Sequence, residues 1–158
     1  MTAFIMMLAV VLSAGAGLTV YQLIQSDFRT VSGKSYTWSD FSGQWVVLNY
    51  FAEWCAPCLR EMPELSAFAA NPPADTTVLA INYDHKTIEE LKAMASTYAI
   101  GPDIIISGPE TRLPVKRPPY LPATFIIGPD GSVADTLMGE VTAAGLRERL
   151  TALQSEPL

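Results

Sequence analysis

Two cysteines, Cys55 and Cys58, are the residues of this chain whose type and spacing best suit chemistry. They follow an apolar run, Val46–Phe51, that is typical of a buried strand, and they lie at the start of a predicted helix. Side chains three positions apart on a helix are close enough to form and break a disulfide with little backbone movement. The first turn of a helix also stabilises a thiolate, because its N–H groups are unsatisfied. We therefore expect Cys55 to attack a partner disulfide and Cys58 to resolve the mixed disulfide.

Three other interpretations of the cysteine pair compete with redox catalysis. A structural zinc site needs four ligands, and beyond its two thiols the chain has one histidine, His85. A structural disulfide that closes so short a loop would remove little entropy from the unfolded chain. Two buried, inert thiols are the third interpretation. The position of the pair between a strand and a helix favours redox catalysis that uses no metal or other cofactor.

The elements that must position the cysteines are predicted from the spacing of apolar residues. Leu59, Met62, Leu65 and Phe68 form a stripe that predicts a helix over about residues 55–70. Further strands are predicted at 77–82, 104–106, 123–127 and 132–137, and the last two are predicted to form a hairpin. A second helix is predicted to begin at the capping box of Thr87 and Glu90 and to end before Gly101, and a third to cover about residues 142–153. Strands that alternate with helices indicate a layered α/β domain.

Composition and charge narrow the class of protein. The chain has 158 residues, about the length of one domain, with a formal net charge of -6 at pH 7 and a pI near 4.6. Its densest basic cluster is Arg112, Lys116 and Arg117, which is too small for a nucleic-acid-binding surface. Positions 2–26 contain no Asp, Glu, Lys, Arg or His, whereas the remainder has the charge content of a soluble globular domain.

The uncharged head predicts a membrane segment. Residues 3–24 are almost entirely apolar and would span roughly 33 Å as a helix, enough to cross a hydrocarbon core. We interpret residues 1–26 as a transmembrane anchor, and a signal peptide is the alternative because residues 14–16 offer a small-x-small cleavage site. Residues 27–35 are polar and are interpreted as a linker, and residues 36–154 as the folded domain.

The residues around the cysteines carry a resemblance to a known family. The segment 48–63, LNYFAEWCAPCLREMP, resembles the active site of the thioredoxin superfamily, and more narrowly that of membrane-tethered TlpA-, ResA- and CcmG-type thiol-disulfide oxidoreductases. Asn49 stands where thioredoxin itself has a buried aspartate, and Glu61 follows the second cysteine by three residues, as in ResA-like proteins. Residues 121–127 are similar to the family's cis-proline loop, and residues 129–131 to its hairpin. The resemblance implies a thioredoxin-like three-layer α/β/α sandwich with a mixed sheet.

The same resemblance implies roles for five further residues. Pro122 is expected to be cis, and the backbone of Leu121 is expected to pair with a substrate segment as a short β-strand; an ordinary trans proline is the alternative. Trp54, Pro57 and Glu61 are expected to tune the redox properties of the cysteines. For Glu61 taken alone, a position early in a helix is equally compatible with a solvated surface residue.

One segment departs from the family pattern. Family members often carry a helical turn before the cis-proline, whereas residues 112–120, RLPVKRPPY, cannot form a regular helix. The basic residues of this loop and Tyr120 are candidates for partner selection, and an exposed loop without a role is the alternative.

The expected activity is the reduction of protein disulfides outside the cytoplasmic membrane. No histidine lies between the cysteines, so we expect modest stabilisation of the Cys55 thiolate and a reducing pair. The resemblance implies an oxidised protein substrate, such as apocytochrome c, and a membrane electron donor of the DsbD/CcdA type. It also implies single-pass attachment with the C-terminal domain on the periplasmic side. Arg29 and Lys34 favour the opposite orientation under the positive-inside rule, but two residues are weak support.

Two other functions on the same fold are alternatives. Copper-delivering relatives use Cys-x-x-x-Cys with a distant histidine, and the spacing here is one residue shorter. A peroxiredoxin-like peroxidase needs Thr or Ser three residues before its reactive cysteine, and Cys55 occupies that position relative to Cys58. A non-catalytic copper or haem chaperone and a peroxidase are therefore less favoured than a thiol-disulfide reductase.

Overall fold

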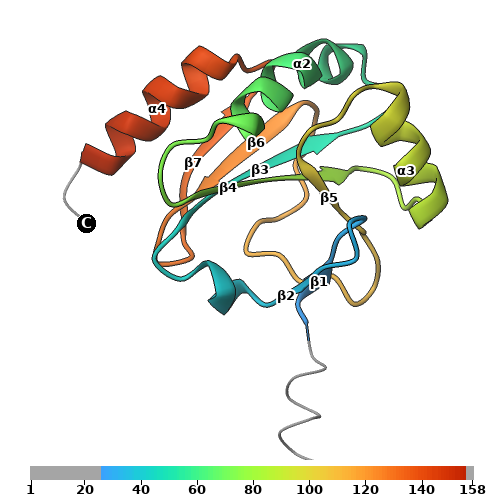
Figure 1. The fold of residues 1–158 in the computed structure, drawn as a ribbon, viewed down its shortest axis with the longest axis horizontal. Helices are drawn as coiled ribbons and strands as arrows, with labels where there is room; N and C mark the ends of the chain where they lie inside the picture. Colours follow the sequence, from blue (N-terminus) through green and yellow to red (C-terminus); the bar gives the residue numbers. More distant parts are fainter. Residues whose placement is uncertain (1–25, 156–158) are drawn as a thin grey trace, which may run out of the picture.

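A mixed five-stranded sheet forms the centre of the computed structural model, which describes residues 26–155 (Figure 1). The strands are β3 (Trp45–Phe51), β4 (Thr76–Asn82), β5 (Asp103–Ile105), β6 (Ala123–Ile127) and β7 (Val133–Met138), in the spatial order β5-β4-β3-β6-β7. β3 pairs in parallel with β4 and antiparallel with β6, and all seven of its residues are buried. The mixed α/β sheet predicted from the sequence is confirmed, and β3 is its central strand.

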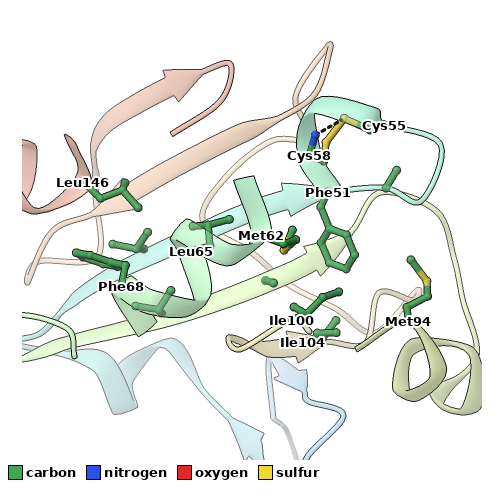
Figure 2. Close-up of a cluster of buried hydrophobic side chains, with 14 of the residues drawn as sticks. Phe51, Cys55, Cys58, Met62, Leu65, Phe68, Met94, Ile100, Ile104 and Leu146 are labelled. Atoms are coloured by element: carbon green, nitrogen blue, oxygen red, sulfur yellow. Dashed lines mark hydrogen bonds between the residues drawn. A yellow bond between two sulfur atoms is a disulfide. The ribbon is translucent and has the colours of Figure 1, made fainter. Parts of the chain in front are cut away.

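Three α-helices cover one face of this sheet. They are α2 (Ala56–Ala70), α3 (Ile88–Thr97) and α4 (Ala143–Ser155). Alternate β3 residues, Val47 and Phe51, pack against Met62 and Leu65 of α2 in one buried cluster (Figure 2). α3 begins at the predicted capping box, whose side chains and backbone N–H groups bond reciprocally at 2.7 and 3.2 Å. The apolar sides of α2, α3 and α4 therefore all pack on the same face of the sheet, and α2 is the helix that carries the cysteines.

The other face of the sheet is covered differently from the expected sandwich. Its cover consists of β1 (Phe28–Arg29), β2 (Ser35–Tyr36), the short 3-10 helix η1 (Trp38–Phe41) and the long loop 106–122, with no α-helix among the described residues (Figure 1). Leu113 and Val115 of the loop pack on the cluster that contains Leu48 and Tyr50 of β3. The expectation of helices in both outer layers is therefore corrected. The physical reason is the prolines of the loop, which remove backbone donors and clash with a helical path.

The segment interpreted as a linker is part of the domain. Residues 27–35 form most of a hairpin in which β1 pairs with β2, and Phe28 is 2% exposed. Thr30 bridges to Ile105 at the edge of the sheet, and the Val31 N–H donates to the Ile104 carbonyl at 2.8 Å. Strands of two residues are too short to show a period-2 pattern, so a sequence rich in Gly and Ser resembled a linker.

The predicted membrane anchor, residues 1–26, lies almost entirely outside the described residues. Within residues 26–155, none of the helices combines the length and the apolar character that a membrane crossing requires.

Replacing Phe28 by Ala tests whether the hairpin belongs to the folded unit. The Phe28 ring lies 5.3 Å from Trp38 and 5.5 Å from Tyr36, between ring centroids, so we expect Phe28→Ala to lower the free energy of unfolding by about 3–5 kcal/mol. The control is Arg29→Ala, an exposed neighbour in the same strand, which should change it by less than about 0.5 kcal/mol. Urea unfolding of both variants is the measurement, and equal, small effects would mean that the hairpin is a detachable linker.

Candidate active site

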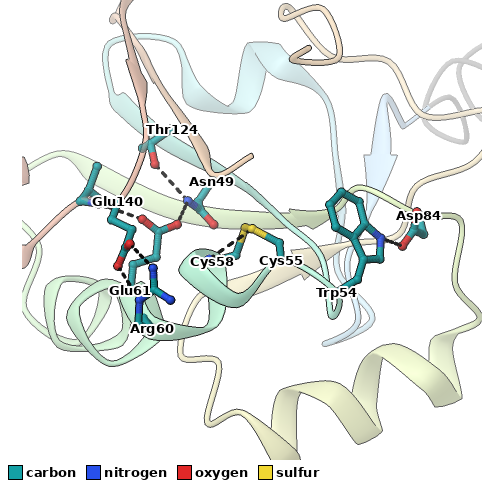
Figure 3. The surroundings of a disulfide bond; sticks show 10 residues. Asn49, Trp54, Cys55, Cys58, Arg60, Glu61, Asp84, Thr124 and Glu140 are labelled. Atoms are coloured by element: carbon teal, nitrogen blue, oxygen red, sulfur yellow. Dashed lines mark hydrogen bonds and ion pairs between the residues drawn. A yellow bond between two sulfur atoms is a disulfide. The ribbon is translucent and has the colours of Figure 1, made fainter. Parts of the chain in front are cut away.

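The two cysteines are joined in a disulfide at the first turn of α2 (Figure 3). Their sulfurs are 2.02 Å apart and their Cα atoms 5.3 Å apart. Cys55 is the N-cap residue of the helix, and its Sγ accepts a hydrogen bond from the Cys58 N–H at 3.3 Å. A sulfur therefore takes the place that a Ser or Asp oxygen usually has at a helix N-terminus. The same N–H and the helix dipole would stabilise a thiolate on Cys55 after reduction.

The two sulfurs differ in exposure, and this difference suggests their order of reaction. Cys55 is 5% exposed and Cys58 is fully buried. The neighbours of Cys55 in the chain, Glu53, Trp54 and Ala56, are exposed, so another polypeptide can approach Cys55 from this side. Cys58 lies below, in the cluster that contains Met62 and Phe51. This arrangement fits Cys55 as the attacking residue and Cys58 as the resolving residue.

Trp54 forms a fixed, exposed surface beside the disulfide. Trp54 is 64% exposed, and its indole Nε1–H donates to Asp84 Oδ2 at 2.8 Å (Figure 3). The ring also stands edge-on to Tyr83, with 6.0 Å between the centroids. Large exposed aromatic side chains that are held in one orientation are typical of contact surfaces.

Pro57 occupies the second position of α2, where a missing N–H costs nothing. The helix can therefore contain a proline between the cysteines and still keep the Cys58 N–H that bonds to sulfur. This accounts for its place in the turn, and its predicted influence on the redox properties stays a prediction.

Glu61 is buried, one turn of α2 beyond Cys58, so the alternative of a solvated surface residue is wrong. It is 2% exposed, and both of its carboxylate oxygens accept hydrogen bonds: Oε1 from Asn49 Nδ2 at 2.9 Å and Oε2 from the Val141 N–H at 2.8 Å (Figure 3). Burial raises the pKa of Glu61, the bonds from Val141 and Asn49 lower it, and the nearby Glu140 raises it slightly; the net direction is upward. A carboxyl group with a raised pKa beside a dithiol is suited to exchange protons with it.

Asn49 connects Glu61 to the neighbouring strand. Its Nδ2 also donates to Thr124 Oγ1 on β6 at 3.0 Å, while its own Oδ1 is buried without a hydrogen-bond partner. An unmade buried hydrogen bond costs about 1–3 kcal/mol, and such groups concentrate at functional sites. From the sequence, Asn49 was recognisable only as a marker of the family. The available signal was a single amide in an otherwise apolar strand, since such a group requires a buried partner.

The segment before α4 is tied to the active-site helix by polar contacts. Arg60 forms an exposed ion pair with Glu140, and the Ala143 N–H donates to Glu64 Oε2 at 2.9 Å. Together with the Glu61–Val141 bond, these contacts hold residues 140–143 against α2. They also neutralise the one cation on the first turns of α2, because the Arg60 guanidinium is shared with a carboxylate.

The Leu121–Pro122 peptide bond is cis, as the resemblance implies. Pro122 is buried, and Leu121 packs against the cluster that contains both cysteines. Within the described residues the backbone of Leu121 makes no hydrogen bond, whereas the Pro122 carbonyl accepts one from the Gly139 N–H. The backbone of Leu121 is therefore free to pair with an added strand.

Metal-binding residues do not converge in the part of the chain that the structure describes. No group of three or more His, Cys, Asp or Glu side chains among residues 26–155 is placed to hold a metal ion. His85 is exposed and its Nδ1 lies 3.4 Å from the Ser107 carbonyl oxygen.

The fold and the N-cap disulfide together define a thioredoxin-like thiol-disulfide oxidoreductase. Comparison with known proteins agrees, and the chain belongs to the AhpC/TSA family, which it matches over residues 22–136. It is 28% identical to thioredoxin-like protein YneN of Bacillus subtilis (strain 168) over 124 residues, which cover 77% of this chain and 72% of the relative. It is 24% identical to thiol-disulfide oxidoreductase ResA of Geobacillus thermodenitrificans (strain NG80-2) over 143 residues, covering 90% and 80% of the two chains.

Solved structures agree on the fold. StoA from Bacillus subtilis matches with a TM-score of 0.66 at 20% identity, over 77% of this chain and 92% of that one. A thiol-disulfide isomerase from Corynebacterium glutamicum matches with a TM-score of 0.68 at 20% identity, over 85% and 96% of the two chains. The resemblance to ResA-type thioredoxin-like proteins inferred from the sequence is thus confirmed.

Replacing Glu61 by Gln tests the burial of its charge. Because the pKa of Glu61 is raised in the folded protein, the native state binds this proton more tightly than the unfolded chain does. Ionisation therefore costs stability as the pH rises from the ordinary carboxyl pKa through the raised native pKa. The free energy of unfolding of the wild type minus that of Glu61→Gln should fall across this window, as measured by urea titrations of the oxidised proteins from about pH 4 to about pH 8.

The matched control for this experiment is Glu64→Gln. Glu64 lies on the same helix and also accepts a backbone N–H, but it is exposed. Glu64→Gln therefore reports the effect of removing one carboxylate from α2 without removing a buried charge. If the free energy of unfolding of the wild type minus that of Glu61→Gln stayed constant or rose with pH, the pKa of Glu61 would not be raised by burial.

Proposed function

We propose that the protein is a membrane-tethered protein-disulfide reductase that acts outside the cytoplasmic membrane. The observation that carries the proposal is the asymmetric pair at the N-terminus of α2, where slightly exposed Cys55 caps the helix and is bonded to fully buried Cys58. The oxidised pair is the product state of such a reductase, and the dithiol is its working state.

The reaction transfers two electrons from the dithiol to the substrate. The Cys55 thiolate attacks one sulfur of a substrate disulfide, so that a mixed disulfide forms and one substrate sulfur leaves as a thiolate. Cys58 then loses its proton and attacks Cys55 Sγ, which releases the second substrate thiolate and restores the Cys55–Cys58 disulfide. Glu61 is the base proposed to take the Cys58 proton, since it is buried one helical turn away and its pKa is raised. The two substrate thiolates are protonated, which completes the balance.

The charges around the pair support the reducing direction. A disulfide is strongly oxidising when its reduced thiolate is strongly stabilised. Here the residues between the cysteines are Ala56 and Pro57, which bring no charge, and the nearby Arg60 is paired with Glu140. The Cys55 thiolate would be stabilised mainly by the Cys58 N–H and the helix dipole.

The proposed setting of the reaction is based on the uncharged segment of residues 1–26 and on the family resemblance. An anchor over residues 1–26 would hold the domain at the cytoplasmic membrane, with the active site on the periplasmic side. A reductase in an oxidising compartment needs a supply of electrons, and we propose a membrane donor of the DsbD/CcdA type. Oxidised protein cysteines, including those of apocytochrome c, are the proposed substrates.

The redox potential tests the direction. After equilibration of the full chain with glutathione buffers, we expect a potential clearly more negative than the roughly -120 mV of a strong oxidant such as DsbA. Pro57→His should raise the potential, because an imidazolium between the cysteines would stabilise the Cys55 thiolate. The ratio of oxidised to reduced protein can be read from thiol alkylation, and a wild-type potential near -120 mV would overturn the reductase proposal.

The order of attack is tested by trapping the intermediate. Cys58→Ser should accumulate a covalent complex with a disulfide-containing protein substrate, because no thiol remains to resolve it. Cys55→Ser should accumulate far less, since Cys58 is fully buried. Non-reducing gels of both variants give the comparison, and preferential trapping by Cys55→Ser would reverse the assigned roles.

A further inference from the structure

A cavity of about 170 Å³ lies on the face of the sheet opposite α2, at the ends of β3 and β4. Its lining residues include Tyr50, Tyr83, His85 and Arg117. It is bounded by the loop 106–122, which occupies the place where a helix would otherwise cover the sheet. The mechanism proposed above uses none of these side chains.

Arg117 is held in place without an acidic partner. Its Cζ lies 3.6 Å from the centroid of the Tyr83 ring, and its Nη2 donates to the Tyr83 carbonyl at 3.1 Å. The Tyr83 hydroxyl in turn donates to the Pro118 carbonyl at 3.3 Å, which fixes the ring on the loop. Within the described residues Arg117 forms no salt bridge. Arg117 is an exposed residue, and the N–H groups of its guanidinium that do not bond to Tyr83 remain available in this orientation.

Tyr50 brings an unused polar group to the same cavity. Its side chain is 5% exposed, and its hydroxyl has no hydrogen-bond partner among residues 26–155. Burial raises the pKa of Tyr50 to about 12, although the Arg117 charge lowers it, so the hydroxyl stays protonated and can donate at neutral pH. Within the described part of the chain the Tyr50 hydroxyl has no partner and is open to the cavity, so together with the unpaired Arg117 it offers N–H and O–H donors to an acceptor with negative charge.

The chemistry of the lining fits a carboxylate. None of the residues lining the cavity is acidic, and Asp84, which follows Tyr83, has its carboxylate bonded to the Trp54 indole. A guanidinium can bind a carboxylate through two parallel N–H groups, and the phenol adds a third donor. The volume is enough for an Asp or Glu side chain.

The position of the cavity connects it to the substrate path. Tyr83 lies between Arg117, which stacks on its ring, and Trp54, which stands edge-on to it and directly precedes Cys55. Along the chain, Arg117 precedes Leu121, the proposed site of β-pairing, by four residues. We propose that Arg117 and Tyr50 bind the carboxylate of an aspartate or glutamate in the substrate polypeptide, close in sequence to the cysteine that Cys55 attacks. This inference rests on the proposed function, because it assumes a polypeptide substrate.

The test measures how fast the reduced full chain reacts with defined peptides. Each peptide carries one cysteine in a mixed disulfide with 2-mercaptoethanol, and one Asp is placed in turn at each of the positions up to about four residues before or after the cysteine, a span that an extended strand covers in about 13 Å. Matched peptides carry Asn instead. In at least one register we expect the Asp peptide to be reduced about tenfold faster than its Asn counterpart, the size of one charge-assisted contact.

Variants separate the pocket from general electrostatics. Arg117→Gln and Tyr50→Phe should each bring the ratio of the Asp to the Asn rate toward one, and Arg117→Lys should keep an intermediate ratio because it retains charge without the planar fork. Arg112→Gln removes the same charge from the same loop, but Arg112 is paired with Asp27, so the ratio should remain near that of the wild type. If Arg112→Gln lowered the ratio of the Asp to the Asn rate as much as Arg117→Gln does, the proposed carboxylate pocket would be wrong.

The two proposals fail in different ways. If the wild type reduces the peptides and neutral 2-hydroxyethyl disulfide, but reduces Asp and Asn peptides at equal rates in every register, the carboxylate pocket is wrong. The proposed reductase function would then still stand. If the wild type reduces neither the peptides nor 2-hydroxyethyl disulfide, the proposed function fails, and this inference fails with it.

Discussion

The helix N-terminus at Cys55 is the constraint on which the rest of the site depends. The first turn of a helix has N–H groups without intrahelical acceptors, and one of them, from Cys58, bonds to the Cys55 sulfur. This geometry requires α2 to begin shortly after β3 ends, and residues 52–55 form the short connection between them. β3 is fixed by ladders to β4 and β6 on its two sides and by burial of every residue, so the end of the strand is among the best-determined points of the fold. The reactive sulfur is thus placed by the core rather than by a mobile loop.

The alternation of β3 presents polar groups to both faces of the sheet. Asn49 points toward α2, where it bonds to Glu61, and Tyr50 points to the opposite face, where it lines the cavity near Arg117. Both residues lie near the end of β3, shortly before the turn that leads to Cys55. A strand with period two therefore allows proton chemistry on one face and contacts to a partner on the other, without either set of groups crowding the disulfide.

Local signals in the sequence predicted most of the elements, because their periodicity and caps are local. The strand at 123–127, the capping box of Thr87 and the absence of a helix in the proline-rich loop all follow from neighbouring residues. The burial of Phe28 and of Glu61 could not be predicted in this way. Phe28 is buried by Trp38 and Phe41, and Glu61 by Asn49 and the Val141 N–H, a residue eighty positions away. These partners are brought together by the tertiary fold, so patterns among neighbouring residues do not reveal them. The spacing of the cysteines was enough to locate the reactive pair, and the resemblance to a family added the cis-proline. The helix that the family leads one to expect on the second face is replaced by a loop, because the prolines there prevent a helix.

The placement of charge makes the proposed binding of an acidic segment compatible with the proposed reducing role of the dithiol. A cation close to the Cys55 sulfur would stabilise the thiolate and make the disulfide more oxidising. Arg60, which lies on the cysteine helix, is neutralised by Glu140, while Arg117 stacks on Tyr83 at the face of the sheet away from α2. The positive charge that would attract a substrate carboxylate is thereby separated from the sulfur by the aromatic pair Trp54 and Tyr83. Since Coulomb interactions weaken with distance and with solvent exposure, Arg117 can contribute to substrate selection with little effect on the redox potential.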